Sequence, residues 1–563
     1  MRLVARPDLH FAPVPGGVYF SGTHGQFVLR GSELLFAVAE GCVPLLEQGA
    51  TEDELVTAIG TERSRPAVRH LVDRLRSNRM LLDPAAFTVP PPDAAERSRH
   101  PEAIARLETL LDDPYAAFAR LRAATVLLTG PATATGPAAR GLRRAGVGQV
   151  TVADSPAAYG GSAETVDAVV VCGAGVTSTL PAGIPDGVPV IPVLLGERVA
   201  LVGPAATGPD GSRTWRAFRD RALGWAAAEN TEPAARPVAG ALAGALAGQL
   251  VFDALTGTGD MGEAHVVHGT ALVADRVTVE GAHMAAAPGR PSSLEDAPAE
   301  PMPEPEDALA AAGALTRRWT GLFASGAGED LPQMPLALRP AEPRADLAAT
   351  VVGWAGHQET ATIAAALQAL RARSPEGGTP AAGLTEEHWL LDGALRGLTP
   401  SAAPLADVTP DDLDPEAARI LAAVRPLLPA APTLELLHVP GLDWRLARVA
   451  GAGSTLGLGW GASAQEAIRT ALCTALARRQ TAGDGEEPVA DMSTDALLFA
   501  AADVLGALRK QLTAHAGESG LVHRGRAVRT DAVLGELPLW YGPVEAAART
   551  PEHQDTQETQ DAN

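Results

Sequence analysis

The chain has 563 residues, more than a single hydrophobic core usually serves, and this length favours about three domains. Asp and Glu number 67 against 45 Lys and Arg, which gives a formal net charge of −22. Such an acidic protein is a poor partner for a polyanion, so general nucleic-acid binding is not expected.

The cysteine content and the N-terminal sequence indicate the cellular compartment of the protein. The three cysteines are spaced too widely for a zinc site built from paired thiolates, and sparse cysteines suit a reducing compartment. The first residues, MRLVARPDLH, lack the apolar core of a signal peptide. The most apolar stretch, 238–255, contains Gln249 and Asp253, so we expect a buried helix there and no membrane span. The expected location is cytoplasmic.

Two Pro-rich, polar stretches divide the chain. Segments 84–102 and 291–307 are predicted to be exposed linkers without fixed structure, and the polar tail 549–563 to be disordered. Three folded blocks remain, and they span residues 1–83, 103–290 and 308–548.

The first block is predicted to contain a small sheet followed by helices. Strands are expected at 10–14, 17–21 and 26–30, and helices at 32–39, 51–59 and 66–78. Thr51 and Glu54 match a capping box at the start of the second helix, and Ser64 is the expected N-cap of the third. This order of elements predicts a winged-helix unit.

The third helix of this block carries two stripes. Val68, Leu71 and Leu75 recur at helical spacing and are expected to face the core. Beside them runs a second stripe, which consists of Arg65, Arg69, Val72, Arg76 and Arg79. We expect this stripe and strand 26–30 to flank a groove.

Three uses fit such a unit. Its helix could insert into DNA, it could be an adaptor with a solvated charged face, or its edge strand could receive a peptide as an added strand. In the third case the expected peptide-binding residues are Phe27, Val28, Leu29, Arg30, Arg65, Arg69, Val72 and Arg76.

Residues 124–154 have the pattern of a nucleotide-binding βαβ unit without its nucleotide chemistry. An apolar strand runs into Gly130, a helix follows, and a second strand ends at Asp154. A dinucleotide fold needs G-x-G-x-x-G after the first strand, but Ala132 and Thr135 occupy the later glycine positions. Gly130 and Asp154 are therefore only weak cofactor-binding candidates, and we expect a Rossmann-like scaffold kept for its shape.

The middle block resembles the ThiF-like, ubiquitin-activating family in its strand, Gly130, Pro137 and the run AGVGQVTVAD at 145–154. Members of that family adenylate a carboxyl terminus and usually carry two C-x-x-C pairs, which this sequence lacks. The wider pattern resembles the ocin-ThiF-like proteins of azole-forming peptide biosynthesis. That resemblance implies a ThiF-type domain that has lost its ancestral chemistry.

The first block is similar in element order to the PqqD-like peptide-recognition element of ribosomal peptide maturation. In that family the leader of a precursor peptide lies against the third strand and the third helix. The corresponding segments are 26–30 and Arg65–Asn78. Leaders of this class are commonly acidic, which would suit the arginine stripe.

The third block holds two segments, 346–374 and 442–480, each predicted to be a strand, a Gly-containing turn and an Ala-rich helix. This pattern resembles the YcaO fold, whose active members hold magnesium and ATP with Glu residues repeated along such helices. Glu466 is retained, but the further positions that call for Glu carry Gln368, Thr474 and Ala477. The resemblance implies a degenerate YcaO-like domain. The other interpretation is an unrelated α/β domain with Ala-rich helices packed on a sheet.

Other candidate sites carry little signal. Three histidines in a strand-rich segment have no thiol or carboxylate at metal-ligand spacing, so structural roles are expected. They are His265, His268 and His283. Cys172 and Cys473 are expected in the core, whereas Cys42, at a predicted helix end, is expected to be the most accessible thiol.

These observations predict an α/β multidomain pseudoenzyme. Its expected function is to bind the leader of a ribosomally made precursor peptide and recruit it to a separate YcaO cyclodehydratase, which forms azolines in thiopeptide or linear azole peptide biosynthesis. No catalytic residue, metal or cofactor is expected in the chain, because ATP and magnesium would be used by the partner. The alternatives are an ATP-dependent ThiF-like adenylating enzyme and a winged-helix transcriptional regulator, and homodimerisation is left open.

Overall fold

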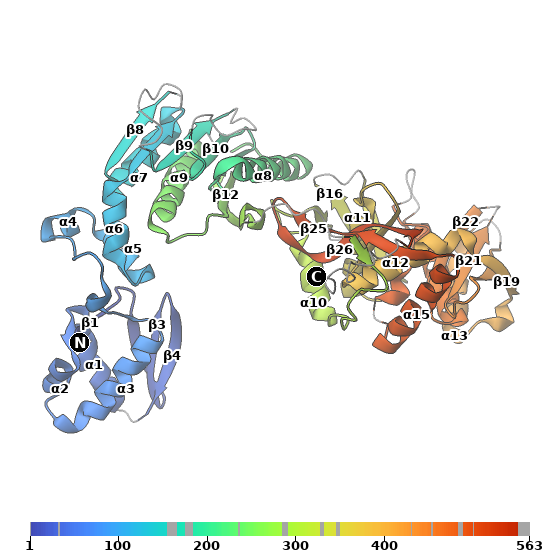
Figure 1. Ribbon diagram of the computed structural model, residues 1–563, viewed down its shortest axis with the longest axis horizontal. Helices are drawn as coiled ribbons and strands as arrows, with labels where there is room; N and C mark the ends of the chain where they lie inside the picture. Colours follow the sequence, from blue (N-terminus) through green and yellow to red (C-terminus); the bar gives the residue numbers. More distant parts are fainter. Residues whose placement is uncertain are drawn as a thin grey trace, which may run out of the picture. The chain divides into compact units, whose positions relative to one another are not determined.

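The computed structural model contains two compact units (Figure 1). The first comprises Met1–Arg216 and Thr231–Thr278, and the second comprises Ala217–Asn230 and Val279–Asn563. The described residues are 2–31, 34–154, 166–174, 184–234, 237–283, 291–326, 331–344, 349–428, 431–451, 454–481, 488–498 and 500–549.

The N-terminal part of the first unit holds two small sheets and three helices. Strands β2 (His10–Val14), β3 (Gly17–Gly22) and β4 (Gly25–Arg30) form one antiparallel sheet in that order, close to the predicted ranges. The helices are α1 (Leu34–Glu47), α2 (Glu52–Ile59) and α3 (Arg65–Ser77). A second sheet pairs β1 (Arg2–Ala5) with β5 (Ala50–Thr51) and β6 (Leu81–Leu82). These strands are too short to show a periodicity, so the sequence did not predict them.

Local chemistry explains where these helices begin and end. The Thr51 hydroxyl accepts from the Glu54 N–H while the Glu54 carboxylate accepts from the Thr51 N–H, which confirms the predicted capping box. Ser64 was expected to cap α3, but its side chain does not, because its own backbone is already helical. Helix α1 continues past its predicted end at residue 39, because Val43 on its inner face is buried in the core.

Arg6 joins the N-terminal part of the first unit to the end of a later helix. Its side chain is 1% exposed and lies 2.5 Å from the carboxylate of Asp112. The same guanidinium donates to the carbonyl oxygens of Arg79 and Glu108. Glu108 belongs to α5 (Pro101–Leu110), so one buried cation with satisfied donors joins the N-terminal part to the rest of the unit.

Both predicted linkers contain regular structure. The stretch 84–102 includes helix α4 (Ala94–Arg99). The stretch 291–307 begins with strand β14 (Pro291–Ser293), which pairs antiparallel with β24 (Leu521–Arg526). The prediction of no fixed structure is therefore wrong over these residues, because long-range pairing is not visible in local composition.

A seven-stranded sheet in the order β13-β12-β11-β10-β9-β7-β8 forms the centre of the rest of the first unit. Strands β10, β9, β7 and β8 are parallel, and β11, β12 and β13 are antiparallel. The strands are β7 (Thr125–Thr129), β8 (Gln149–Ala153), β9 (Ala168–Gly173), β10 (Val190–Leu195), β11 (Val199–Val202), β12 (Glu263–His268) and β13 (Val273–Thr278). The accompanying helices are α6 (Pro114–Ala123), α7 (Ala132–Ala145) and α9 (Val238–Thr256). Helix α8 (Gly208–Ala228) begins in the first unit, and its residues from Ala217 onward belong to the second.

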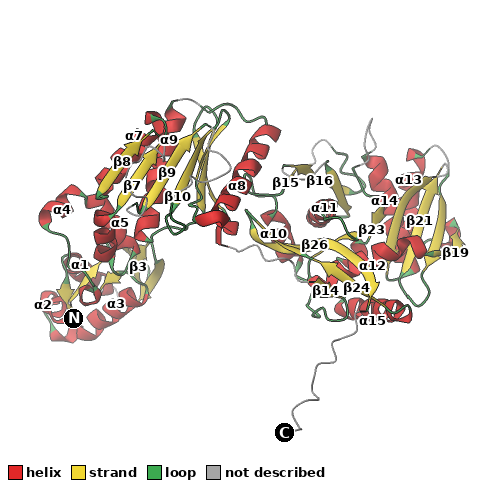
Figure 2. Cartoon of the chain, turned by 45° about the horizontal axis from the view of Figure 1, so that its top comes forward, coloured by secondary structure: helices red, strands yellow, loops and turns green. Residues whose placement is uncertain are grey.

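Helix α9 is the apolar stretch that was expected to be buried, and this prediction is confirmed. By length and composition it could cross a membrane, but 56% of its apolar window is buried inside the protein. A Cβ at Gly244 would overlap the main chain of Ala134, so glycine allows α9 to pack on α7 at backbone distance. Figure 2 shows the two helices beside the sheet.

The second unit is built from helices and sheets, and the sheets are antiparallel except for the parallel pair of β22 and β23. One sheet has the order β14-β24-β26-β18 with β25 paired to β26, and a second has the order β19-β20-β21-β22-β23. Its strands are β15 (Phe323–Ser325), β16 (Ala337–Pro343), β17 (Val351–Ala355), β18 (Thr379–Gly383), β19 (Ala403–Val408), β20 (Thr433–His438), β21 (Arg445–Gly451), β22 (Ser454–Gly461), β23 (Met492–Ser493), β25 (Val528–Asp531) and β26 (Gly535–Ala548). Its helices are α10 (Pro305–Ala314), α11 (Gln358–Ala372), α12 (Glu386–Leu398), α13 (Pro415–Val424), α14 (Ala464–Gln480) and α15 (Ala502–Glu518).

Segment 346–374 has the predicted order of strand, turn and helix, as β17–α11. Segment 442–480 holds one strand more than predicted, because β21 precedes β22 and α14. In β17–α11 and in β22–α14 the helix packs directly on the backbone of the strand. A Cβ at Gly353 would overlap the main chain of Ala365, and one at Gly459 would overlap the main chain of Ala471. The glycines of these segments therefore serve strand–helix packing.

Candidate functional site

Strand β4 lies at the edge of its sheet, and its register shows which main-chain groups face outward (Figure 1). The Gly31 N–H donates to the Gly16 carbonyl oxygen at the end of the β3–β4 pair. Residues of an antiparallel pair alternate between bonding to the partner strand and pointing away from it, so every second residue before Gly31 bonds to β3. The residues that point away, called the β4 edge from this point on, are Gln26, Val28 and Arg30.

Proline closes the opposite edge of the same sheet. On β2, Pro13 pairs with Val18, which uses its own main-chain groups to bond to β4. The backbone nitrogen of Pro13 therefore lies on the outer side of β2. Proline has no N–H to donate, and natural sheets use proline at edges to prevent strand addition. The two edges thus differ, and the β4 edge is the one that can receive another strand.

Aromatic side chains lie on the inner face beside the β4 edge. The rings of Phe27 and Phe20 stack with centroids 5.2 Å apart. The Arg74 guanidinium of α3 lies 5.5 Å from the centroid of the Phe27 ring. Arg74, which sequence reasoning left out, is thus the cation of α3 that contacts strand β4. In the sequence, Arg74 stands out only as a positive charge on the side of this helix away from the predicted stripe.

The predicted arginine stripe is paired with acidic residues of its own domain. Arg65 lies 2.7 Å from Asp53, and Arg69 lies 3.0 Å from Glu52. Both acids are in the first turn of α2. Arg76 also has a carboxylate 3.8 Å away. Arg65 and Arg69 therefore face α2, where their charge is partly offset. Arg79 lies beyond the end of α3 and pairs with Asp112. Arg74 and Arg30 stand beside the β4 edge.

Two predicted peptide-binding residues belong to the core instead. Leu29 is 3% exposed and Val72 is 7% exposed. The pleat of β4 directs Leu29 inward, and helical periodicity places Val72 on the same face as the buried Val68 and Leu75. Their side chains cannot touch a docked peptide, so this part of the prediction is corrected. Val28, at 43% exposure, is available on the outer face.

In the middle block, Gly130 is explained by packing. It has φ of +116°, and a Cβ there would overlap the carbonyl oxygen of Cys172 on β9. Thr135 is buried and its hydroxyl donates to the Pro131 carbonyl within the first turn of α7. Asp154 is exposed at the end of β8, and the residues after it lie outside the described part of the chain.

The carboxyl ends of the parallel strands β7, β9 and β10 border a cavity of about 280 Å³. Among the described residues its lining is uncharged, and consists of Pro131, Thr133, Ala174, Leu195, Gly196, Ala200, Pro237, Ala239 and Gly240. Nucleotide sites at this edge of a parallel sheet hold polyphosphate with glycine-rich turns and cationic groups. The described lining therefore offers no group that would balance the charge of a triphosphate.

His265 and His268 lie on β12 and each has a carboxylate neighbour. His265 Nε2 is 3.2 Å from Glu263, and His268 Nε2 is 2.9 Å from Asp275. The sequence indicated no carboxylate at metal-ligand spacing, and it did not reveal these single pairings. Since they are three residues apart on a strand, they point to opposite faces and cannot share an ion. The side chain of His283 lies outside the described part, within which no three metal-ligating side chains gather.

Cys42 is buried, contrary to the prediction that it would be the most accessible thiol. Helix α1 continues beyond it and keeps its side chain in the core, where burial raises the pKa of the thiol to about 11. Cys473, on α14, is the partly exposed one, although burial raises its pKa to about 12.

A buried charge cluster lies between α11, α12 and the segment after β23. Asp392 is 0% exposed and lies 2.9 Å from Arg371 and 2.8 Å from Arg396. The Thr494 hydroxyl donates to the same carboxylate. Burial opposes ionisation of Asp392, but the two guanidinium groups outweigh it and hold the pKa of this carboxyl well below its usual range. These four residues are called the charge cluster below.

The residues singled out by the YcaO resemblance have structural partners. Gln368 accepts a hydrogen bond from Arg371, and both border a cavity of only about 20 Å³. That volume holds about one water molecule, whereas ligand sites measure roughly 300–1,000 Å³. Glu466 accepts from the Ala462 N–H and so stabilises the start of α14, and Thr474 and Ala477 are buried in the core.

Comparison with solved structures identifies the fold of the chain. No family model and no curated protein matches the sequence. A solved structure described as a heterocyclase in complex with substrate and cofactor matches with a TM-score of 0.57 at 13% identity, over 97% of this chain and 94% of that one. The heterocyclase TruD matches with a TM-score of 0.50 at 14% identity over the same shares. The chain therefore has a heterocyclase-like, multidomain α/β fold along nearly its whole length.

Proposed function

We propose that the chain is a non-catalytic partner of a separate YcaO cyclodehydratase. It binds the leader of a ribosomally made precursor peptide and presents the peptide to that enzyme, in the cytoplasm. The enzyme uses ATP and magnesium to form azolines in thiopeptide or linear azole peptide biosynthesis. A heterocyclase-like fold over nearly the whole chain supports a role in the same chemistry.

The observation that carries the proposal is the asymmetry of the N-terminal sheet. Pro13 closes the β2 edge, whereas the β4 edge presents the main-chain groups of Gln26, Val28 and Arg30. An added strand gains main-chain hydrogen bonds, and side chains next to the edge select its sequence. Arg74 and Arg30 favour an acidic peptide.

The charge cluster supports a non-catalytic role. Active YcaO members need carboxylates to hold magnesium on the phosphates, and this chain has Gln368 and Arg371 on the helix concerned. The adjoining cavity of about 20 Å³ leaves no room for a nucleotide. A fold retained without such a site would be kept for binding a partner.

Reconstitution tests this proposal. The chain is mixed with a YcaO enzyme and a precursor peptide encoded beside it, and azoline formation is followed by the loss of one water, 18 Da, per ring in the mass spectrum. We expect fast cyclisation only when both proteins and the leader are present. The Val28→Pro variant, which blocks the β4 edge alone, should lose this acceleration, and Pro13→Val on the opposite edge is the matched control. Equal rates without this chain would refute the presentation role.

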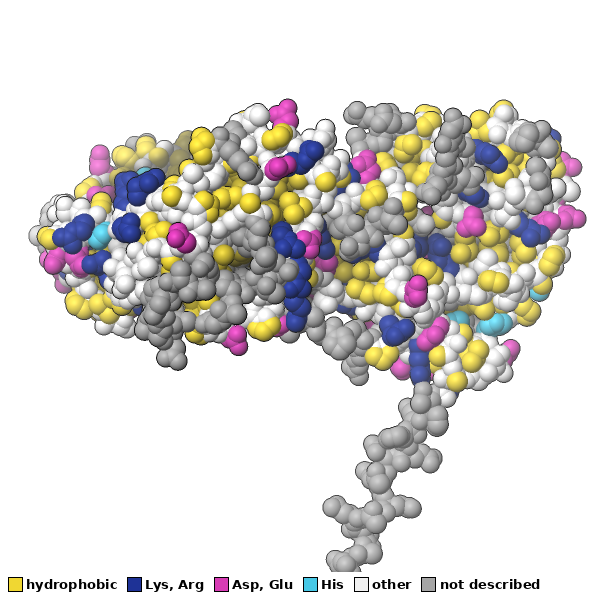
Figure 3. Space-filling view, turned by 90° about the horizontal axis from the view of Figure 1, so that it is seen from above, with side chains coloured by type: hydrophobic (Ala, Val, Ile, Leu, Met, Phe, Trp, Pro, Cys, Tyr) yellow, Lys and Arg dark blue, Asp and Glu magenta, His cyan; other side chains and the backbone are white. Residues whose placement is uncertain are grey.

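Two alternatives differ in what they predict. If the chain is itself a heterocyclase or a ThiF-like adenylating enzyme, it alone will consume ATP in the presence of peptide and magnesium. If it is a transcriptional regulator, it will retard DNA that carries its promoter. Lys and Arg side chains on the face seen in Figure 3 are scattered among Asp and Glu, a distribution that does not favour DNA binding.

A further inference from the structure

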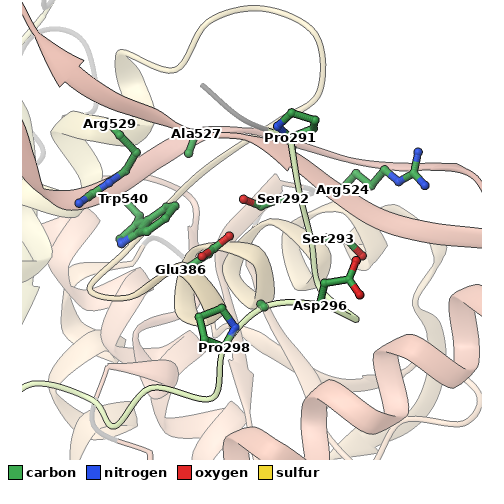
Figure 4. Close-up of a pocket in the computed structure, with 11 residues that line it drawn as sticks. Pro291, Ser292, Ser293, Asp296, Pro298, Glu386, Arg524, Ala527, Arg529 and Trp540 are labelled. Atoms are coloured by element: carbon green, nitrogen blue, oxygen red, sulfur yellow. The ribbon is translucent and has the colours of Figure 1, made fainter. Parts of the chain in front are cut away.

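A second cavity of the second unit lies apart from the charge cluster. Its volume is about 710 Å³, within the roughly 300–1,000 Å³ typical of ligand sites. Strand β14 and the turn after it form one wall, the sheet around β24 and β26 forms another, and the first turn of α12 closes the third side (Figure 4).

Long-range contacts hold the wall formed by β14 in place. Ser292 pairs with Gly525 of β24, and Leu294, directly after the strand, is 1% exposed. Arg509 of α15 donates to the Ala297 carbonyl oxygen at 2.9 Å. The segment is thus anchored on both sides of its turn, which prevents it from collapsing onto α12 and filling the cavity.

The lining combines carboxylates, hydroxyls and apolar groups. Glu386, in the first turn of α12, and Ser292 both point into the space between the walls (Figure 4). Asp296 adds a second carboxylate. The Arg529 guanidinium lies 4.2 Å from the ring centroid of Trp540 and donates to a main-chain carbonyl and to a carboxylate of β26. Arg524 also lines the cavity, so two arginines stand against the two carboxylates. Because the charges of the lining balance, the cavity suits a ligand without net charge and not a polyphosphate.

We propose that this cavity binds a short extended segment of the precursor peptide, downstream of its leader, that is uncharged and bears hydroxyl side chains. Glu386 and Ser292 supply hydrogen-bond partners for such side chains, and Pro291 and Pro298 supply apolar walls. The inference rests on the proposed function, because the leader at the β4 edge raises the local concentration of the segment. Two linked contacts give an affinity well above that of either alone.

Fluorescence anisotropy tests this inference with labelled precursor peptides from the short reading frames beside the gene. Each peptide is made in full length and as the leader alone. We expect the wild-type protein to bind the full-length form at least about tenfold more tightly than the leader. Ser292→Trp fills the cavity, and Glu386→Arg removes a hydrogen-bond acceptor and leaves the lining positively charged, so both should reduce full-length binding to the level of the leader. Glu518→Arg, on an exposed position of α15, is the matched control and should change neither.

The outcomes separate the two proposals. If the leader binds but full-length binding is unchanged in both cavity variants, the cavity is not a peptide site and the inference is overturned. If the leader does not bind the wild-type protein, the proposed function fails. In that case the binding of the downstream peptide without its leader is measured. The inference stands only if the wild-type protein binds this peptide and Ser292→Trp and Glu386→Arg abolish the binding. Unchanged thermal melting of each variant shows that the unit is folded.

Discussion

The guanidinium of Arg74 lies 5.5 Å from the centre of the Phe27 ring, so helix α3 places a cation directly beside the open edge of β4. A cation over an aromatic face at an exposed site contributes about 0.5–1 kcal/mol, enough to orient the guanidinium without neutralising its charge. An acidic peptide paired with β4 would therefore meet an oriented positive charge. Arg65 and Arg69, in contrast, already have carboxylate partners.

We expect Arg74→Glu to weaken leader binding about tenfold or more, because a charge-assisted contact becomes a repulsion. Arg69→Glu, which changes the same charge on the side of α3 that faces α2, should weaken it less than about threefold. Titration of a labelled leader at several salt concentrations measures both variants. Equal losses in the two would mean that the stripe and not Arg74 steers the peptide.

Val28→Pro should abolish strand addition while leaving the β3–β4 pairing intact. The Val28 N–H points away from β3, so its loss removes a group that only an added strand can use. The reverse change on the other edge, Pro13→Val, restores an outward N–H and should leave leader affinity unchanged. A Val28→Pro protein that melts normally and still binds the leader tightly would rule out main-chain pairing at this edge.

Asp392→Asn should destabilise the second unit by about 3–5 kcal/mol, because it leaves Arg371 and Arg396 buried without their counter-charge. The pKa of Asp392 lies below its unfolded value of about 3.9, so its contribution is present above that pH and is lost as the pH falls further. Denaturant unfolding at pH 7 and pH 3 should show a smaller difference between variant and wild type at pH 3. A neutral effect at pH 7 would show that the cluster does not stabilise the fold.

His388 makes stability depend on pH in a higher window. Burial lowers its pKa to about 4 from an ordinary value of about 6.5. Between these values the unfolded chain takes up a proton that the folded chain does not, so stability falls as the pH falls, by up to about 1.4 kcal/mol per pH unit. His388→Asn retains an acceptor for the Leu384 N–H and removes the titration, so its melting temperature should vary less between pH 6.5 and 4. An unchanged slope would assign that dependence to other groups, of which His523 is the first to test.

Gly130→Ala should lower the melting temperature of the first unit and leave its response to ATP unchanged. The residue has a left-handed backbone, and a Cβ would meet the carbonyl oxygen of Cys172, so a cost of at least about 1–3 kcal/mol follows. Gly141→Ala, on the open side of α7, should be neutral or stabilising by up to about 1 kcal/mol. Calorimetry with ATP and magnesium should detect no tight binding in either variant or in the wild type. A sub-millimolar dissociation constant in the wild type, lost in Gly130→Ala, would assign the glycine to nucleotide binding.

Local patterns determined those features whose causes lie within a few residues. The capping box of Thr51 and Glu54, the three strands around Phe20 and the buried helix 238–255 follow from side-chain periodicity and hydrogen bonds of short range. The sequence also indicated that Gln368, Thr474 and Ala477 cannot replace metal-binding carboxylates, because residue type alone decides that point.

The tertiary structure decided everything that depends on how one element faces another. The spacing of residues shows which side chains share a face of α3, but it does not show which face lies against β4. The sequence therefore predicted the arginine stripe as the peptide-binding face, whereas Arg74 is the residue that lies at β4. The pairing of β14 with β24 joins residues far apart in the sequence, which local composition cannot reveal. The charge cluster likewise brings Arg371, Asp392 and Thr494 together across three elements, because only packing of the whole unit removes them from water.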